Sequence, residues 1–263
     1  MGGVVSERAG VVNIALEAEM LAGCFASVAA AQATGSPVVG VLAGMLAGAL
    51  VGLLHAFFTQ YLRVAHILSG VALNLALLGF TSYAVRLYPG GSLDTKATVP
   101  DAVTTGLAFV AVAAVWFVLN KTALGLRLRA IGENPEAARS AGVNVPAIRY
   151  GAVIVSGALA GLGGVALALA GLGAFRQNMT AGRGYVALAA VIFGRWTPLG
   201  AAGAALVFAL GDALQQALQT DGRLNIPPDF LTLLPYVLTL LALGFMGSKT
   251  SAPASLGTDD VSV

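Results

Sequence analysis

Charged residues are scarce in this chain. Of its 263 residues only 14 are Lys or Arg and 12 are Asp or Glu, which together make up 10% of the sequence. A soluble domain usually carries about a quarter charged residues, because its surface must face water. Apolar residues make up 57% of the chain instead. The composition therefore argues against a soluble fold and a disordered chain, and the net charge of +2 is too small to indicate a nucleic-acid partner.

Residues that carry redox or metal chemistry are also few. Cys24 is the single cysteine, so the chain can build neither a disulfide framework nor a zinc site. Its place in an apolar run predicts a small buried hydrophobe rather than a reactive thiol. The segment GSKT at 247–250 lacks the spacing and the preceding strand of a nucleotide-binding loop. We therefore expect no metal, no cofactor, no catalytic residue and no ATP site in this chain.

Long runs without charge predict membrane-spanning helices. About 20 apolar residues cross a bilayer core, and in hydrocarbon each backbone polar group must be paired within its own segment. We therefore expect an all-α integral membrane protein, a polytopic bundle of about 7–8 transmembrane helices with one short or broken helix, formed as a single domain by residues 1–247. The tail 248–263 is predicted to be disordered and cytoplasmic. The expected spans lie near 14–35, 37–61, 64–88, 102–120, 149–171, 199–219 and 230–247, with a shorter apolar piece at 185–194.

Basic residues set the expected orientation. Loops that stay in the cytoplasm carry the excess of Lys and Arg. We therefore place the connection 121–149 in the cytoplasm, together with the short turn at Arg63. The connections 89–101 and 172–184 then lie outside, and the tail lies inside provided that 185–196 crosses or re-enters the membrane. The basic residues of the first connection are Lys121, Arg127, Arg129, Arg139 and Arg149.

Glycine recurs every fourth residue in one expected span. A face of small residues lets another helix backbone approach closely where no hydrophobic force drives helices together. Gly157 and Gly161 form a similar face on another span. Both faces predict close packing within the bundle, and a contact with a second subunit is the alternative. The repeating residues of the first face are Gly40, Gly44, Gly48 and Gly52.

The basic connection contains a short helix with its own start and stop signals. Asn134 can cap it because its side-chain oxygen accepts an orphan backbone N–H group, and the proline that follows suits the first helical position. Glu136 and Arg139 match the two ends of the helix dipole, and Gly142 can adopt the left-handed conformation that ends a helix. We expect a helix over 135–141, either an ordinary loop helix or a docking element for a cytoplasmic partner. The candidate docking residues are Gly132, Glu133, Asn134, Pro135, Glu136, Ala137, Ala138, Arg139 and Gly142.

Polar residues are costly inside apolar spans, so they mark either hydrogen bonds between helices or a transport pathway. Both interpretations stay open for this chain. His55 and His66 lie at the expected cytoplasmic ends of adjacent spans, and they are interpreted as interfacial polar residues, with a proton relay as the less favoured alternative. The candidate pathway residues are Asn13, Glu17, Asn74, Asp212, Gln215 and Gln216.

Four blocks of the sequence resemble one protein family. The blocks are SERAGVVNIALEAEML at 6–21, ILSGVALNLALLGFTSYAVR at 67–86, GENPEAARSAGVNV at 132–145 and GRGYVALAAVIFGRWTPLG at 182–200. In order and spacing they are similar to the permease family of bacterial ABC importers for branched-chain amino acids, ribose and nucleosides. The first two blocks are most similar to the nucleoside-type branch, and the resemblance covers nearly the whole chain.

This resemblance implies the membrane-spanning permease subunit of an ATP-driven importer for nucleosides or simple sugars, in the bacterial plasma membrane. It also implies that the loop 132–145 seats in a groove on a separate ATPase, so that the chain itself is not an enzyme. The implied partners are a second permease subunit, two cytoplasmic ABC ATPase subunits or domains, an external substrate-binding lipoprotein and the lipid bilayer. Nucleic acid is not among them.

The chain departs from the family pattern near its start. The family usually has NIGLEGMM where this chain has NIALEAEM at 13–20, so both glycines are replaced and Glu19 is added. Family members carry a further apolar helix before the Ser-Glu-Arg block, which leads us to expect a truncated or misassigned start at Met1. The alternative function is a secondary transporter or channel driven by an ion gradient, with coupling-ion sites among Asp212, Glu17 and Glu19.

Overall fold

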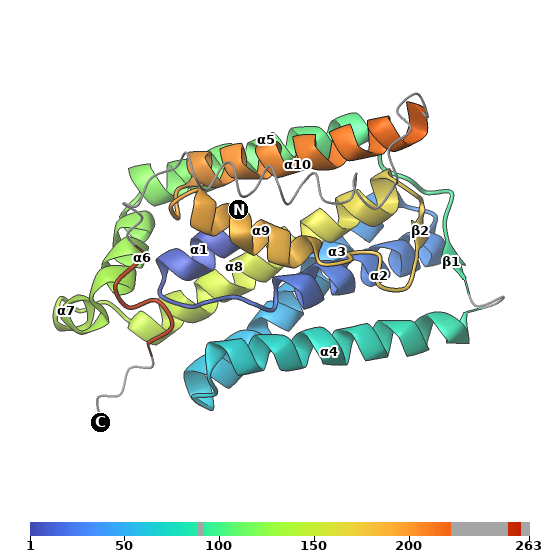
Figure 1. Ribbon diagram of the computed structural model, residues 1–263. Coiled ribbons are helices and arrows are strands. Elements are labelled where there is room, and N and C mark those ends of the chain that lie inside the picture. The colour runs from blue at the N-terminus through green and yellow to red at the C-terminus, as the bar shows by residue number, and fades with distance from the viewer. Residues whose placement is uncertain (89–91, 222–251, 259–263) are drawn as a thin grey trace.

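The computed structural model describes residues 1–88, 92–221 and 252–258, and helices dominate them (Figure 1). The long helices are α2 (Leu16–Thr34), α3 (Pro37–Ala56), α4 (His66–Ala84), α5 (Asp101–Lys121), α8 (Val145–Val165) and α10 (Pro198–Asp221). The short helices are α1 (Gly2–Arg8), α6 (Ala123–Glu133), α7 (Pro135–Ser140) and α9 (Arg183–Phe193). Further turns of helix at Phe57–Tyr61, Val85–Leu87 and Ala166–Ala170 extend α3, α4 and α8, and the two short strands are β1 (Leu93–Asp94) and β2 (Ala174–Phe175). The predicted all-helical membrane fold is confirmed.

Most of the expected spans appear as helices of membrane length. In the described part of the chain, 5 helical segments are long and apolar enough to cross a membrane. The expected span 14–35 forms α2, whose first half is buried in the bundle, and α9 is the short apolar helix expected near 185–194. The expected span 230–247 lies outside the described residues, so the total of about seven to eight helices stays a prediction. The five segments are Pro37–Tyr61, His66–Leu87, Asp101–Lys121, Val145–Ala170 and Pro198–Gln215.

The centre of the bundle is formed by α2, α3 and α8, which pack backbone against backbone. A Cβ atom on Gly48 would collide with the carbonyl oxygen of Gly157, and one on Gly157 would collide with the carbonyl oxygen of Gly48. A Cβ atom on Gly161 would collide with the carbonyl oxygen of Gly44, and one on Gly23 of α2 would collide with the carbonyl oxygen of Gly161. The two predicted glycine faces therefore pack against each other inside one chain, which is the interpretation that the sequence favours.

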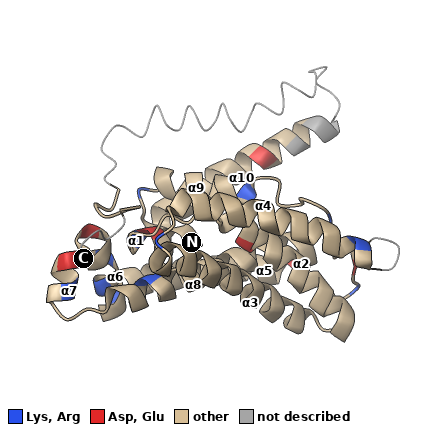
Figure 2. Cartoon of the chain, turned by 90° about the horizontal axis from the view of Figure 1, so that it is seen from below, with Lys and Arg blue, Asp and Glu red and all other residues tan. Residues whose placement is uncertain are grey.

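The two ends of the bundle differ in structure. At one end β1 pairs antiparallel with β2, with Leu93 opposite Phe175, so the expected outer connections 89–101 and 172–184 meet there. The helices α6 and α7 lie at the opposite end (Figure 1). Charged residues gather mainly at these two ends, and the long middle section carries few of them (Figure 2). This distribution fits a bundle whose middle lies in hydrocarbon and whose ends lie in water.

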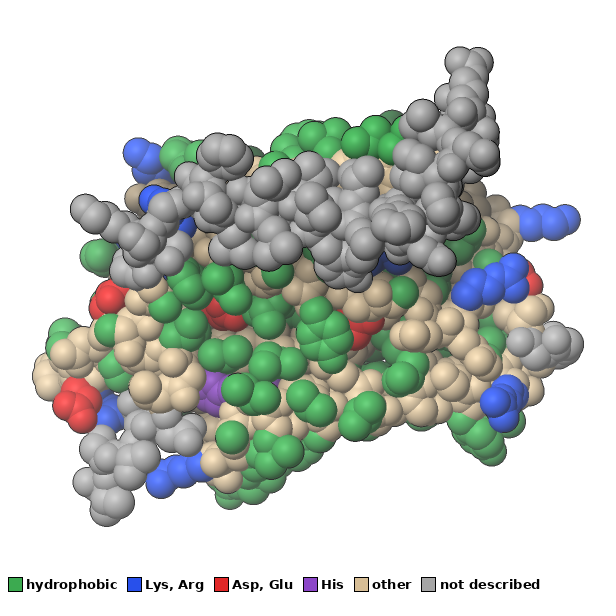
Figure 3. All heavy atoms as spheres, viewed as in Figure 1, with side chains coloured by type: hydrophobic (Ala, Val, Ile, Leu, Met, Phe, Trp, Pro, Cys, Tyr) green, Lys and Arg blue, Asp and Glu red, His purple; other side chains and the backbone are tan. Residues whose placement is uncertain are grey.

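The outer surface of the bundle is apolar along its middle. Only 11% of the 18-residue apolar stretch of α5 is buried. Phe109 and Phe117 on this helix are exposed. On the face visible in Figure 3, apolar side chains cover the middle and most Lys and Arg side chains lie toward the two ends. A surface of this kind suits contact with lipid chains or with another membrane subunit.

Residues 252–258, within the tail predicted to be disordered, form a turn. It packs against the end of the bundle that carries α6 and α7, which we call the basic end. The Ser255 N–H donates to the carbonyl oxygen of Gly132 at 2.9 Å, and the Gly257 N–H donates to that of Gly10 at 3.0 Å. Ser255 is buried. The backbone of this segment thus finds partners on α6 and on the chain that follows α1.

A test of the glycine packing is Gly48→Ala. The added methyl group meets the backbone of α8, and overpacking of this kind costs about 1–3 kcal/mol. We expect a lower Tm for the purified protein in detergent. The matched control is Gly79→Ala on α4, because no heavy atom lies within 4 Å of a Cβ built at Gly79. This control should leave Tm unchanged or raise it slightly, and equal losses in both variants would contradict the packing described.

Candidate functional site

The helix α7 begins and ends with the signals that its sequence predicts. The side-chain oxygen of Asn134 accepts a hydrogen bond from the Ala137 N–H at 2.9 Å, and a proline occupies the first position. At the other end the Gly142 N–H donates to the carbonyl oxygen of Arg139 at 2.9 Å, and Gly142 has a φ of +81°. The helix runs from Pro135 to Ser140, so it ends one residue earlier than the predicted helix 135–141.

The short helix has one buried face and one exposed face. Pro135 and Ala138 are buried, and Ala138 packs with Ile131 and Val145 in a small apolar cluster. This cluster fixes α7 to the ends of α6 and α8. The exposed residues present opposite charges to water at the basic end of the bundle. The exposed residues are Glu133, Asn134, Glu136, Ala137, Arg139, Ser140, Ala141 and Gly142.

The end of α6 lies against the end of α1. A Cβ atom on Gly132 would collide with the carbonyl oxygen of Arg8, so Gly132 serves close packing rather than surface contact. From α8, the Arg149 Nε donates to the carbonyl oxygen of Ala9 at 3.2 Å. The chain that leaves α1 is therefore held both by the helix before α7 and by the helix after it.

The turn at 252–258 also contacts the end of α6. The Ser255 hydroxyl oxygen lies 2.9 Å from the carbonyl oxygen of Ile131 and 2.8 Å from that of Gly132, so its single O–H group can donate to either. The last carbonyl groups of a helix lack partners inside the helix, so Ser255 satisfies the end of α6. Sequence reasoning missed this residue, and its only local signal was the turn formed between Pro253 and Gly257.

A helix break at residues 9–15 separates α1 from α2. The break was not predicted, since the sequence pointed to 185–196 as the broken helix. Two histidines hold its backbone: His55 Nε2 lies 3.1 Å from the carbonyl oxygen of Val12, and the Val12 N–H donates to His66 Nδ1 at 3.2 Å. Backbone groups without water must be paired, so these histidines take the place of the missing helical hydrogen bonds.

Asn13 lies in this break and connects it to α2 and α8. Its Nδ2 group lies 2.9 Å and 3.1 Å from the two carboxylate oxygens of Glu19, and 2.9 Å from the hydroxyl oxygen of Ser156. All three side chains are buried. The added carboxylate that distinguishes this chain from the family pattern is thus paired with a predicted pathway residue.

Glu17 binds the loop that leads into α9. One of its carboxylate oxygens accepts from the Thr180 hydroxyl at 2.6 Å and from the Gly182 N–H at 2.9 Å, and the other accepts from the Gly184 N–H at 2.7 Å. Gly184 fits because a Cβ atom there would collide with the backbone of Glu17. This carboxylate therefore holds the start of α9 against the start of α2.

Asn74 of α4 contacts the same region. Its side-chain oxygen accepts from the Ala18 N–H at 2.9 Å, and its Nδ2 group donates to the carbonyl oxygen of Ile14 at 3.0 Å and to the Tyr185 hydroxyl oxygen at 2.8 Å. Asn13, Glu17 and Asn74 thus converge on the break and the first turn of α2. We name this group the break cluster.

Asp212 and Gln215 on α10 do not join the break cluster. Asp212 is exposed and Gln215 is half-buried, and within the described residues no hydrogen bond joins either of them to the cluster. The Gln216 side chain lies outside what the structure describes. Asp212 and Gln215 are three residues apart on α10 and so share a face of this helix, but the spacing carries no information on which other helix that face meets.

The roles of two carboxylates can be separated by matched amide substitutions. Glu17→Gln replaces one of the two accepting carboxylate oxygens with an NH2 group, so at least one of the three hydrogen bonds at the start of α9 is lost. A hydrogen bond to a charged group contributes roughly 1.5–3 kcal/mol. We expect a Tm several degrees below wild type. Asp212→Asn makes the same change at an exposed site and should leave Tm unaltered. Loss of transport by Glu17→Gln with an unchanged Tm would instead indicate direct substrate contact.

A glycine-packed bundle with a helix break, a buried polar cluster and an exposed charged helix at its basic end has the features of a membrane transport subunit. The chain belongs to the family described as branched-chain amino acid transport system / permease component, which matches residues 1–243. It is the permease subunit of an ABC importer and a multi-pass protein of the plasma membrane. Permease subunits of this family are transport components and not enzymes.

Named relatives agree with this family. The chain is 38% identical to the guanosine ABC transporter permease protein NupQ of Bacillus subtilis, over 98% of this chain and 90% of the relative. It is 37% identical to the nucleoside ABC transporter permease protein NupC of Lactococcus lactis, over the same shares, 98% and 90%. A Haloferax volcanii permease assigned provisionally to glucose transport is 32% identical over 96% of this chain and 88% of the relative. No solved structure matches the chain.

Proposed function

We propose that this chain forms the translocation pathway of an importer for nucleosides. The proposal is carried by its near full-length similarity to permeases named for guanosine and for nucleosides. Simple sugars are the second candidate class, because a relative assigned provisionally to glucose also aligns over nearly the whole chain. The break cluster is the proposed part of the pathway, together with Asp212, Gln215 and Gln216 on α10. Its amide and carboxylate groups are of the kind that hydrogen-bond sugar hydroxyls and bases.

The energy for import is proposed to come from a separate ATPase that docks on α7. The support is local: the helix has an exposed face that carries Glu136 and Arg139 and a buried face fixed by the apolar cluster of Ala138. A helix held in this way moves as a unit with the ends of α6 and α8. The basic end that carries it is placed in the cytoplasm, because cytoplasmic loops carry the excess of Lys and Arg.

Movement of α7 has a short route to the break cluster. The end of α6 lies on the carbonyl group of Arg8, and Arg149 of α8 binds the carbonyl group of Ala9. Both contacts adjoin the helix break, and Asn13 within it binds Glu19 and Ser156. We therefore infer that closure of the ATPase shifts the break and opens or closes the pathway beside it.

The complete transporter is proposed to contain a second permease subunit, two cytoplasmic ABC ATPase subunits or domains, and an external substrate-binding lipoprotein. Two permease subunits would enclose the pathway between them, and the exposed apolar surfaces of α3, α4 and α5 are suited to that contact or to lipid. The lipoprotein would meet the end that carries β1 and β2, opposite α7.

Docking is tested by reversing both exposed charges of α7, with Glu136→Lys and Arg139→Glu in one variant. We expect roughly tenfold less co-purified ATPase, because complementary charges at an interface govern docking. The control reverses a charge pair at the opposite end, Asp94→Lys with Arg176→Glu, where the two side chains lie 3.9 Å apart. That variant should retain the ATPase. Equal retention by both variants would count against docking at α7.

Substrate and energy source are tested by uptake of labelled guanosine. The chain is expressed with candidate ATPase and binding-protein genes from its own genome in cells that lack other nucleoside importers. We expect uptake that stops on ATP depletion, persists with a proton ionophore and is not displaced by glucose. Uptake that survives ATP depletion but collapses with the ionophore would favour a secondary transporter, and displacement by glucose would favour a sugar importer.

A further inference from the structure

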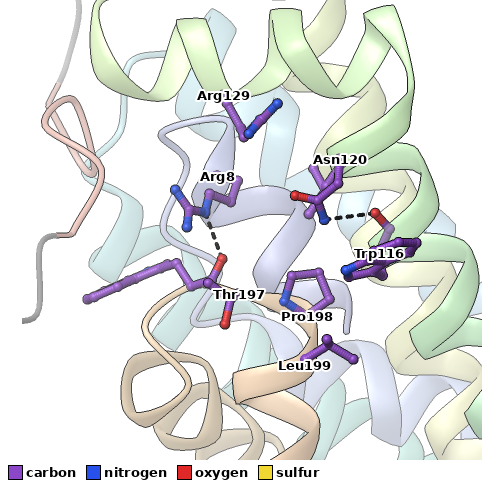
Figure 4. Close-up of a pocket in the computed structure, with 9 residues that line it drawn as sticks. Arg8, Trp116, Asn120, Arg129, Thr197, Pro198 and Leu199 are labelled. Atoms are coloured by element: carbon purple, nitrogen blue, oxygen red, sulfur yellow. Dashed lines mark hydrogen bonds between the residues drawn. The ribbon is translucent and has the colours of Figure 1, made fainter.

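A pocket of about 290 Å³ lies at the basic end of the bundle, where α1, α5, α6 and the turn between α9 and α10 meet. Figure 4 shows Arg8, Arg129 and Asn120 around its upper part, and Pro198 and Leu199 at its lower edge. The wall is therefore cationic and polar on one side and apolar on the other. Neither the transport pathway nor the docking face of α7 uses these residues.

Two guanidinium groups give the pocket its positive charge. The Arg8 Nε donates to the carbonyl oxygen of Trp196 at 2.6 Å and the Arg129 Nε donates to that of Gly125 at 3.4 Å. A guanidinium has five N–H donors, so each group retains donors for a ligand. The carboxylate that interacts electrostatically with Arg8 is Glu133, which is exposed and does not line the pocket. A ligand with negative charge would reduce the repulsion between the two guanidinium groups.

The position of the pocket matches the membrane interface. Trp116, on the last turns of α5, lines it and is 37% exposed, and the Lys121 ammonium lies 5.9 Å from the centre of the Trp116 ring. Tryptophan and lysine at the end of an apolar span are typical of the level of lipid headgroups. Beyond the pocket the surface of α5 is apolar, with Phe117 exposed. A ligand here can place a charged group between the arginines and an acyl chain along α5.

We propose that this pocket binds the phosphate of an anionic phospholipid headgroup from the cytoplasmic leaflet. Arginine pairs well with phosphate oxygens because its N–H donors form a planar fork, and basic pockets between membrane helices on the cytoplasmic side bind anionic headgroups. The bound phosphate bridges Arg129 of α6 and Arg8, which contacts the α9–α10 turn. The lipid thereby ties the helix that precedes α7 to the last described helix pair.

Tryptophan fluorescence offers a direct test. The chain has 2 tryptophans, and both of them, Trp116 and Trp196, line this pocket. The full-length protein is reconstituted in phosphatidylcholine with a small fraction of a lipid whose acyl chains carry bromine, a contact quencher. We expect roughly fivefold stronger quenching per mole of brominated phosphatidylglycerol than of brominated phosphatidylcholine, from the attraction of an anionic headgroup to a positioned arginine.

Matched variants assign the effect to the pocket. Arg129→Gln should abolish the preference for phosphatidylglycerol, whereas Arg127→Gln, an exposed residue on the same helix, should retain it. Unchanged quenching of both variants by brominated phosphatidylcholine shows that they are folded. The proposal is overturned if the two brominated lipids quench the wild type equally, or if both variants lose the preference alike. Inorganic phosphate is added in excess as a further arm, and if it removes the preference the ligand is the free anion and not the lipid.

Discussion

A stretch of buried backbone that is not helical is the constraint on which this structure depends. Between α1 and α2 the chain leaves the helical pattern at residues 9–15, and its peptide groups there are buried or half-buried, so they need hydrogen-bond partners. Side chains supply the partners: His55 and His66 bind Val12, Asn74 binds Ile14 and Arg149 binds Ala9. Elements that are far apart in sequence are thus brought together by the need to pair a few peptide groups.

The glycine faces bring the helices close enough together for this arrangement. Because α3 and α8 meet at backbone distance through Gly48 and Gly157, and α2 lies against Gly161, polar groups of the break can reach partners on three helices. The same close contacts allow the bundle to be held by many shallow interactions and not by long interlocking side chains. Small residues at helix contacts let the backbones lie close together. A core of this kind can permit small helix shifts and still stay packed, and an ATP-driven permease needs both properties.

Signals that act within a few residues predicted the structure well. Asn134 and Gly142 delimit α7 because a cap and a left-handed glycine act on the helix beside them. The long apolar runs form helices because each backbone polar group in hydrocarbon must be paired within its own segment. Interactions between distant segments were not predictable in the same way. No local pattern connects Glu17 with Gly184, or Ser255 with the end of α6, and the predicted pathway set divided between the break cluster and α10 for the same reason. The family resemblance supplied what local signals could not, namely the class of protein and the role expected of the basic loop.

The turn at 252–258 completes the end of α6 with a segment that is synthesised much later than α6 itself. Ser255 completes the hydrogen bonding of Ile131 and Gly132 at the end of α6, yet the ribosome adds it after every described helix. Before Ser255 is added, water must satisfy those carbonyl groups, and the end of α6, which leads into α7, lacks one of its contacts. A chain that ends before this turn therefore leaves the carbonyl groups of Ile131 and Gly132 without the partner that Ser255 provides.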